Sequence, residues 1–160
     1  MIARLVGFVL LAYGTISLAQ DFGADQGRLT GLFGPYVYHY RDTGYNDLPR
    51  VTGLEWEPRG SSLEFGAVYF MNSYYQDSWL AYVGKRWFIS DNKEGVYLSV
   101  IGGPVYGYRG DHEDRIPLNH HGLGVAAAPS IGYQYRSVNS QLMFLGNSAI
   151  VVIFGYDFWR

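Results

Sequence analysis

Few residues of this chain are able to carry covalent chemistry. The chain contains no cysteine, so a nucleophile has to be a hydroxyl, which needs a base to take its proton and a third group to orient that base. Asp77-Ser78-Trp79 supplies a serine, and His39, in the sequence YVYHYR, supplies a base. We therefore take His39, Asp77 and Ser78 as the candidate catalytic residues, provided that the fold gathers them at one rim.

A second group of reactive side chains lies between positions 112 and 121. His112, Glu113, Asp114, His120 and His121 are residue types that bind metals, but their spacing matches no structural or catalytic metal site. We expect a solvated loop here, and we predict neither a metal nor an organic cofactor.

The N-terminus indicates which solvent the rest of the chain meets. Met1 to Arg4 is a short positive start, an apolar run follows, and Ser17-Leu18-Ala19 places small residues where a signal peptidase reads them. About 15 apolar residues are too few for a spanning helix, which needs roughly 20. We predict a cleavable signal peptide over 1–19 and a single outer-membrane β-barrel domain over 20–160.

Composition bears on the partners of the chain. The net charge of −2 gives no basic surplus, so no nucleic acid is expected as a partner.

Aromatic residues make up 18% of the chain and charged residues only 16%, and Tyr and Trp suit a membrane interface because each joins an apolar body to a polar tip. After the signal peptide no apolar run could form a spanning helix, which leaves a closed barrel as the membrane structure that satisfies every backbone group.

Alternation of side chains with period two, interrupted by turn residues, predicts eight strands. Their predicted ranges are Gly34 to Arg41, Arg50 to Glu57, Ser62 to Met71, Ser78 to Ser90, Gly95 to Tyr108, Leu123 to Tyr135, Ser140 to Leu145, and Ala149 to Trp159. The predicted fold class is therefore all-β, an eight-stranded antiparallel transmembrane β-barrel.

The two faces of the predicted strands differ in polarity. In the third strand Leu63, Phe65, Ala67, Tyr69 and Met71 share the face expected to look outward. Glu55, Glu64 and Asp157 fall on the inner face, where Lys85 or Arg86 could neutralise them. The alternation does not decide which of those two cations points inward.

The connectors predict an orientation. Short turns are expected at residues 58–60, 91–94 and 136–139, whereas long loops occupy 42–49 and 109–122. Short turns face the periplasm in outer-membrane barrels and long loops face the cell exterior. We expect both termini on the periplasmic side of the outer membrane and the candidate catalytic residues on the exterior rim.

Four short elements resemble one known family, the outer-membrane lipid A palmitoyltransferases of the PagP type. They are Tyr38-His39 in the first strand, Gln76 to Trp79 before the fourth, Arg115 to Asn119 (RIPLN) after the fifth, and Pro129 to Tyr133 (PSIGY) entering the sixth. They occur in the family's order, and the resemblance covers most of the mature chain.

The resemblance implies an acyltransferase that moves a palmitoyl-like chain from a glycerophospholipid donor to a hydroxyl of lipid A in lipopolysaccharide. The family's functional residues fall on His39 as the base, Asp77 as a group that orients or stabilises the imidazolium, and Ser78, which either attacks or positions the acceptor. We expect the enzyme to be a monomer.

Two further features bear on how lipid would enter. Pro35, Pro49, Pro117 and Pro129 cannot donate to a strand ladder, and breaks of that kind would admit an acyl chain sideways from the membrane, as the resembling family is understood to do. On the inner wall of the fourth strand that family has a glycine that sets the depth of the acyl pocket, and here the register around Gly84 is shifted from the family pattern. A charged Arg86 at the pocket floor would shorten the accepted chain. The family's N-terminal amphipathic helix is missing or vestigial in Gln20 to Phe33.

Two other functions and one other fold are compatible with parts of this sequence. A lipid hydrolase would use the same residues and give the acyl group to water, and a non-catalytic barrel would serve structure or adhesion with its lumen filled by side chains. A soluble lipocalin-like barrel would also alternate, but its outer face would be polar, unlike the apolar outward sets here.

Overall fold

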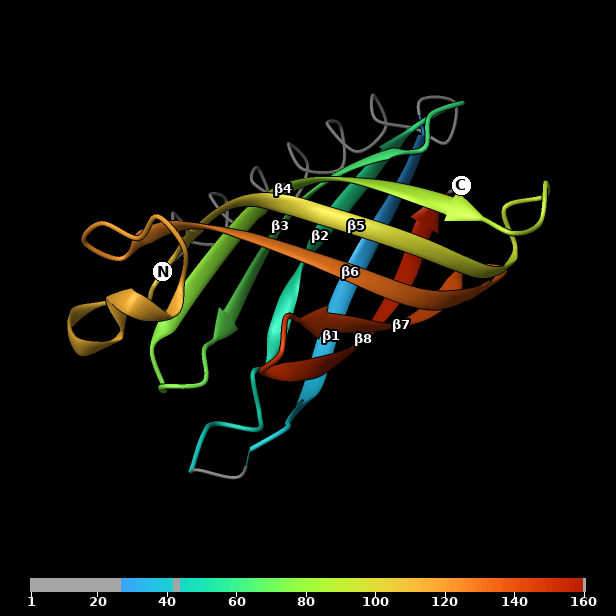
Figure 1. Cartoon of the computed structure of the whole chain (residues 1–160). Coiled ribbons are helices and arrows are strands. Elements are labelled where there is room, and N and C mark those ends of the chain that lie inside the picture. Colours follow the sequence, from blue (N-terminus) through green and yellow to red (C-terminus); the bar gives the residue numbers. More distant parts are fainter. Residues whose placement is uncertain (1–26, 42–43, 160) are drawn as a thin grey trace, which may run out of the picture.

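The computed structural model describes residues 27–41 and 44–159, and these form a closed eight-stranded antiparallel barrel. The predicted fold class is confirmed as an all-β, eight-stranded antiparallel barrel (Figure 1). The strands are β1 (Gly27–His39), β2 (Val51–Pro58), β3 (Leu63–Met71), β4 (Asp77–Phe88), β5 (Gly95–Tyr106), β6 (Leu123–Tyr135), β7 (Val138–Leu145) and β8 (Ala149–Trp159), and a short 3-10 helix, η1 (Gly110–Arg115), lies between β5 and β6. The predicted signal peptide lies outside the described residues.

Each strand pairs with its neighbours in sequence, and β1 pairs with β8 to close the barrel, with Leu29 opposite Trp159. We call the end that carries the β1–β2, β3–β4, β5–β6 and β7–β8 connections the loop end, and the opposite end the turn end. The ends of β1 and β8 that point away from the loops, Gly27 and Trp159, both lie at the turn end. His39 lies at the loop end of β1.

The outer face is apolar along the strands, as the alternation predicts. In β3 Leu63, Phe65 and Ala67 are exposed, whereas Glu64 and Val68 are buried inside. Exposed aromatic and aliphatic side chains continue around the barrel, among them Phe33, Leu54, Trp79, Val83, Trp87, Leu98, Val125, Tyr133, Leu142 and Phe154. Within the described ranges no helix is long and apolar enough to cross a membrane.

Six strands differ from their predicted bounds at one end or both, and two of them, β1 and β7, begin two or more residues before their predicted starts. β1 begins at Gly27, not Gly34. The prediction missed the first part of the strand because three glycines interrupt its alternation. At one of them, Gly34, the Cβ of any other residue would lie 2.9 Å from Val51 Cβ. β7 begins at Val138, because the turn needs only Arg136 and Ser137, and Arg136 takes the left-handed conformation with φ 51°. The glycines of β1 give the strand room where it crosses close to its neighbours.

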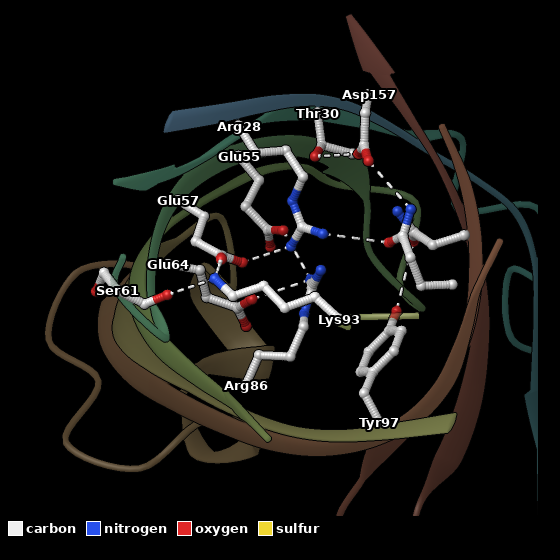
Figure 2. A network of polar contacts seen from close by, with 12 residues as sticks. Arg28, Thr30, Glu55, Glu57, Ser61, Glu64, Arg86, Lys93, Tyr97 and Asp157 are labelled. Atoms are coloured by element: carbon white, nitrogen blue, oxygen red, sulfur yellow. Dashed lines mark hydrogen bonds and ion pairs between the residues drawn. The ribbon is translucent and has the colours of Figure 1, made fainter. Parts of the chain in front are cut away.

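The lumen at the turn end is filled by charged side chains that neutralise one another (Figure 2). The Arg86 Nη2 lies 2.8 Å from Glu55 Oε1 and 2.9 Å from Glu64 Oε2. Tyr82 donates to Glu55 over 2.8 Å and Ser99 donates to Glu64 over 2.5 Å. The cation left undecided by the sequence is therefore Arg86; Lys85 points outward, with its Nζ 5.5 Å from the ring of Trp87.

A second part of this polar filling ties the barrel seam. Arg28 forms an ion pair with Glu57 over 2.5 Å and donates to Gln134 over 3.3 Å. Thr30 of β1 donates to Asp157 of β8 over 2.8 Å, and Gln134 also donates to Asp157, over 3.0 Å. These contacts thus link side chains of the first, second, sixth and last strands inside the barrel, and Figure 2 shows Arg28, Thr30, Glu57 and Asp157 among them.

Towards the loop end the lumen is apolar. A single packed cluster contains Leu32, Val37, Val51, Val68, Tyr82, Ile101, Ala128, Met143, Ala149, Val151 and Ile153, with Phe70 and Leu80 against it. Tyr82 joins the two layers, because its ring belongs to this cluster and its hydroxyl donates to Glu55. This apolar layer therefore lies between His39 and the charged residues of the turn end, which form its floor.

Candidate active site at the loop end

The imidazole of His39 lies between a carboxylate and a hydroxyl. Its Nδ1 is 2.9 Å from Asp47 Oδ1 in the β1–β2 connection, and its Nε2 is 2.8 Å from Ser73 Oγ in the β3–β4 connection. The His39 side chain is only 5% exposed, whereas that of Asp47 is 56% exposed.

These contacts fix the proton positions. The carboxylate of Asp47 only accepts hydrogen bonds when ionised, so Nδ1 carries the proton that it donates. In the neutral ring Nε2 is then an acceptor, and the Ser73 hydroxyl donates to it. The carboxylate orients the ring through Nδ1 and the ring is placed to take a proton from the hydroxyl, which is the division of roles in a Ser–His–Asp catalytic triad.

Two buried asparagines hold the connections that carry this group. Asn46 donates its backbone amide to the Ser73 carbonyl over 3.0 Å and its side-chain amide to the carbonyls of Met71 and Asn72, each over 3.3 Å. The Asn72 Oδ1 accepts from the amides of Tyr74 (2.9 Å) and Gln76 (3.0 Å), which closes the β3–β4 turn. Asp47 and Ser73 therefore directly follow two asparagines whose hydrogen bonds hold both connections, and breaking these bonds would leave buried polar groups without their partners.

Aromatic rings cover the site from the loop side. The Tyr45 ring lies 4.9 Å from that of His39 and 5.5 Å from that of Tyr74, and Tyr74 stacks on His112 with centroids 3.9 Å apart. Burial is the main cause that raises the pKa of Tyr74, and burial raises the pKa of Tyr108 to about 12. The two phenols therefore stay neutral at physiological pH.

The sequence-predicted residues Asp77 and Ser78 occupy different surroundings. Ser78 faces the lumen, is fully buried, and donates to the Gln76 carbonyl over 3.1 Å. Asp77 lies on the outer side and accepts from the Tyr69 hydroxyl over 2.5 Å. In the described part of the chain no hydrogen bond joins His39 to either residue; its hydrogen-bond partners are Asp47 and Ser73.

Gly107 covers Ser78. Its φ is 136°, and a Cβ built there would lie 2.1 Å from Ser78 Oγ. Only glycine fits this close approach, and the backbone of residue 107 shields the Ser78 hydroxyl from the loop side.

A hollow of about 500 Å³ opens beside the triad. Tyr45, Asn46, Asp47, Leu48, Arg50, Met71 and Tyr75 line it. It combines apolar side chains with one cation, Arg50, and borders the triad through Asp47.

The residues predicted to shape an acyl pocket lie along the lumen wall. Gly84 makes room for Glu64, because a Cβ there would lie 2.8 Å from Glu64 Cγ. Arg86 belongs to the charged floor, beneath the apolar cluster. That cluster is packed with side chains, so an acyl chain that entered the lumen would have to displace some of them.

The predicted prolines have unequal effects on strand pairing. Pairing of β6 with β7 begins only at Ser130, so the stretch from Leu123 to Pro129 has no β7 partner within the described chain. Pro35 lies in the irregularity of the β1–β8 register between Phe33 and Tyr36. The Pro117 carbonyl accepts from the Val125 amide over 3.1 Å and covers the outermost part of the β6 edge, whereas the Pro49 carbonyl accepts from Met71 and extends the β2–β3 pairing.

The histidine-rich loop shows no metal geometry. Among residues 27–41 and 44–159, no three His, Asp or Glu side chains converge as metal ligands. His112 is occupied by its stacking on Tyr74, and His120 and His121 are exposed.

Sequence reasoning missed Asp47 and Ser73. Asp47 follows His39 by 8 positions and Ser73 by 34, and neither lies in a recognised motif. The available signal was topological: all three flank connections of the same barrel end, and Asn46 and Asn72 precede Asp47 and Ser73 as turn-forming residues.

Fold and site together define a closed eight-stranded β-barrel that carries a Ser–His–Asp arrangement at its loop end. No known protein-family model matches the chain, and none of the curated proteins matches it.

Proposed function

We propose that this protein is an outer-membrane lipid acyltransferase, which moves a fatty acyl chain from a glycerophospholipid to lipid A. The observation that carries the proposal is the hydrogen-bonded chain from Ser73 through His39 to Asp47. Attack on an ester carbonyl requires removal of a proton from the attacking hydroxyl, and an imidazole oriented by a carboxylate is a suited base. This chemistry requires no metal or organic cofactor.

The outer face supports a place in the membrane. Aromatic and aliphatic side chains are exposed all around the strands, which in water would be a patch far larger than soluble monomers carry. Trp79 stands near the loop end and Trp87 near the turn end, as expected of aromatic girdles at two interfaces. With the long connections outside, the triad faces the cell exterior, where lipid A lies.

Two features offer a route for lipid. The edge of β6 without a β7 partner, which ends at Pro129, leaves a break in the wall that faces lipid in this orientation. The hollow beside Asp47 offers Leu48 and Met71 to an acyl chain and Arg50 to a phosphate. Because the lumen below is packed and floored by Arg86, we do not expect palmitate to be the preferred chain, and a shorter one fits better.

Mass spectrometry of lipid A tests the proposal. Cells that express the full chain should gain one acyl chain on lipid A, and cells with His39→Ala at matched outer-membrane levels should not. The exposed His120→Ala serves as the matched control and should leave the gain intact. No gain with the folded wild-type protein in the outer membrane would refute the transferase.

Hydrolysis of the same lipids is a second candidate. The Asp47 side chain is 56% exposed, so water reaches the neighbourhood of the imidazole and competes with a lipid hydroxyl. A hydrolase would release fatty acid and lysophospholipid without acylating lipid A. If neither product appears and His39→Ala changes nothing, the protein is a non-catalytic barrel.

A further inference from the structure

We infer that Ser73 is the nucleophile, and that the reaction passes through a fatty acyl ester on its Oγ. The inference rests on the proposed function for its substrate class, long-chain carboxylic esters, but its geometry is independent of the acceptor. Ser73 is the hydroxyl in contact with the His39 imidazole, 2.8 Å from Nε2.

The alternative serine lacks the features of a nucleophile. Ser78 Oγ donates to a backbone carbonyl rather than to an imidazole. The side chain is fully buried, and the close approach of Gly107 blocks its hydroxyl. Ser73 is only half-buried, and its turn stands at the loop end, next to the hollow lined by Asp47 and Met71.

The first half of the reaction consumes the donor. Ser73 Oγ bonds to the acyl carbonyl carbon while its proton moves to His39 Nε2. The tetrahedral adduct collapses, the bond from that carbon to the glycerol oxygen breaks, and the proton on Nε2 passes to this oxygen. The products are a lysophospholipid and an acyl ester on Ser73.

The second half repeats these steps with the acceptor. A hydroxyl of lipid A, or water in the hydrolytic case, adds to the ester carbonyl and gives its proton to Nε2. Ser73 Oγ then leaves and takes that proton back. Asp47 is a positioning residue throughout, because it holds Nδ1 protonated and so keeps Nε2 free to accept.

A fluorophosphonate carrying a long alkyl chain tests this assignment, because it phosphonylates activated serines. The folded full chain in detergent micelles should gain one adduct, and peptide mapping should place it on Ser73. Ser73→Ala should abolish the adduct and Asp47→Asn should slow its formation by roughly 10²–10⁴-fold. Ser148→Ala, on another connection of the same end, is the matched control and should label at the wild-type rate.

The result that overturns the inference is an adduct on Ser78, an adduct that survives Ser73→Ala, or no adduct at all. Folding of each variant is checked by the mobility shift of the unheated barrel in gels. Labelling of Ser73 in a protein that does not acylate lipid A keeps the nucleophile and refutes the transferase. Acylation of lipid A that survives Ser73→Ala keeps the transferase and refutes Ser73 as the nucleophile.

A second pair of variants avoids dependence on the alanine substitution. Because the chain has no cysteine, Ser73→Cys introduces a unique thiol, both alone and combined with His39→Ala. A thiol beside an imidazole is more reactive because its thiolate is stabilised. Iodoacetamide at pH 6.5 should alkylate the thiol of Ser73→Cys about tenfold faster than the same thiol in the double variant Ser73→Cys/His39→Ala, and equal rates would contradict contact with His39.

Discussion

Arg86 and Glu64 form an ion pair inside the lumen, Nη2 to Oε2 2.9 Å, and both side chains are 1% exposed. A second carboxylate, Glu55, binds the same nitrogen at 2.8 Å. One guanidinium therefore holds two buried carboxylates, on β2 and β3, from a position on β4. Such a group is costly to break, since each carboxylate left alone would keep its desolvation without its partner.

Arg86→Leu should destabilise the barrel by about 3–5 kcal/mol, the usual cost of leaving buried charges without their partner. The measurement is urea unfolding in detergent micelles, followed by tryptophan fluorescence. Lys85→Leu is the matched control, because Lys85 points outward and should cost far less. Equal losses in the two variants would mean that the lumen is not the source of the stability.

Gly84→Ala should destabilise the protein more than Gly102→Ala. A Cβ at Gly84 meets Glu64 Cγ and Ile101 Cγ2 at 2.8 Å, whereas at Gly102 the nearest atom lies 3.6 Å away. The crowding displaces Glu64 and so weakens its contact with Arg86, at a cost of about 1–3 kcal/mol. Thermal unfolding of the two variants side by side checks this, and an unaffected Gly84→Ala would show that the wall yields there.

Val83→Arg tests the outer face. Val83 is exposed near the middle of β4, so in a bilayer its side chain meets hydrocarbon. An arginine there should cost roughly 2–4 kcal/mol for folding into lipid vesicles, against about 0–1 kcal/mol near an interface. Ser62→Arg, exposed at the turn end, is the control. Similar costs for both would argue against membrane insertion in this register.

Alkaline pH should destabilise the fold through Tyr108. Burial raises its pKa to about 12, so the folded protein favours the neutral phenol more than the unfolded chain does. The resulting stability is complete below the ordinary tyrosine pKa of about 10 and is lost as the pH rises through about 12. Unfolding free energies measured from pH 9 to 12 should fall more steeply in the wild type than in Tyr108→Phe; parallel curves would disprove the contribution.

The fold was largely readable from alternation, because each strand has one apolar and one mixed face. Leu63, Phe65 and Ala67 of β3 follow the prediction residue by residue. The start of β1 did not, because glycine has no side chain to mark a face, and Gly27, Gly31 and Gly34 fall within that stretch. The choice between Lys85 and Arg86 depended on register, which only the pairing with β3 and β5 defines.

The candidate site was less predictable. The sequence predicted that His39 lies at the outer end of the first strand, and the structure has it at the loop end of β1; its role stays a prediction. The partners of His39 depend on the paths of two connections, and these are set by the hydrogen bonds of Asn46 and Asn72. The predicted pair Asp77-Ser78 lies at the start of β4, where successive side chains point to opposite faces of the strand. Asp77 therefore points outward and Ser78 points into the lumen.

The seam between β1 and β8 has a consequence for how the molecule is made. Thr30 and Asp157, which bond across it, are 127 positions apart, so closure is the contact of greatest sequence separation and carries the largest loop entropy. Until it forms, both outer edges of the sheet remain open to pairing with other chains. Closure of the barrel should therefore be a slow, late step of folding. A chaperone that shields these two edges would raise the yield of closed barrels without changing their final stability.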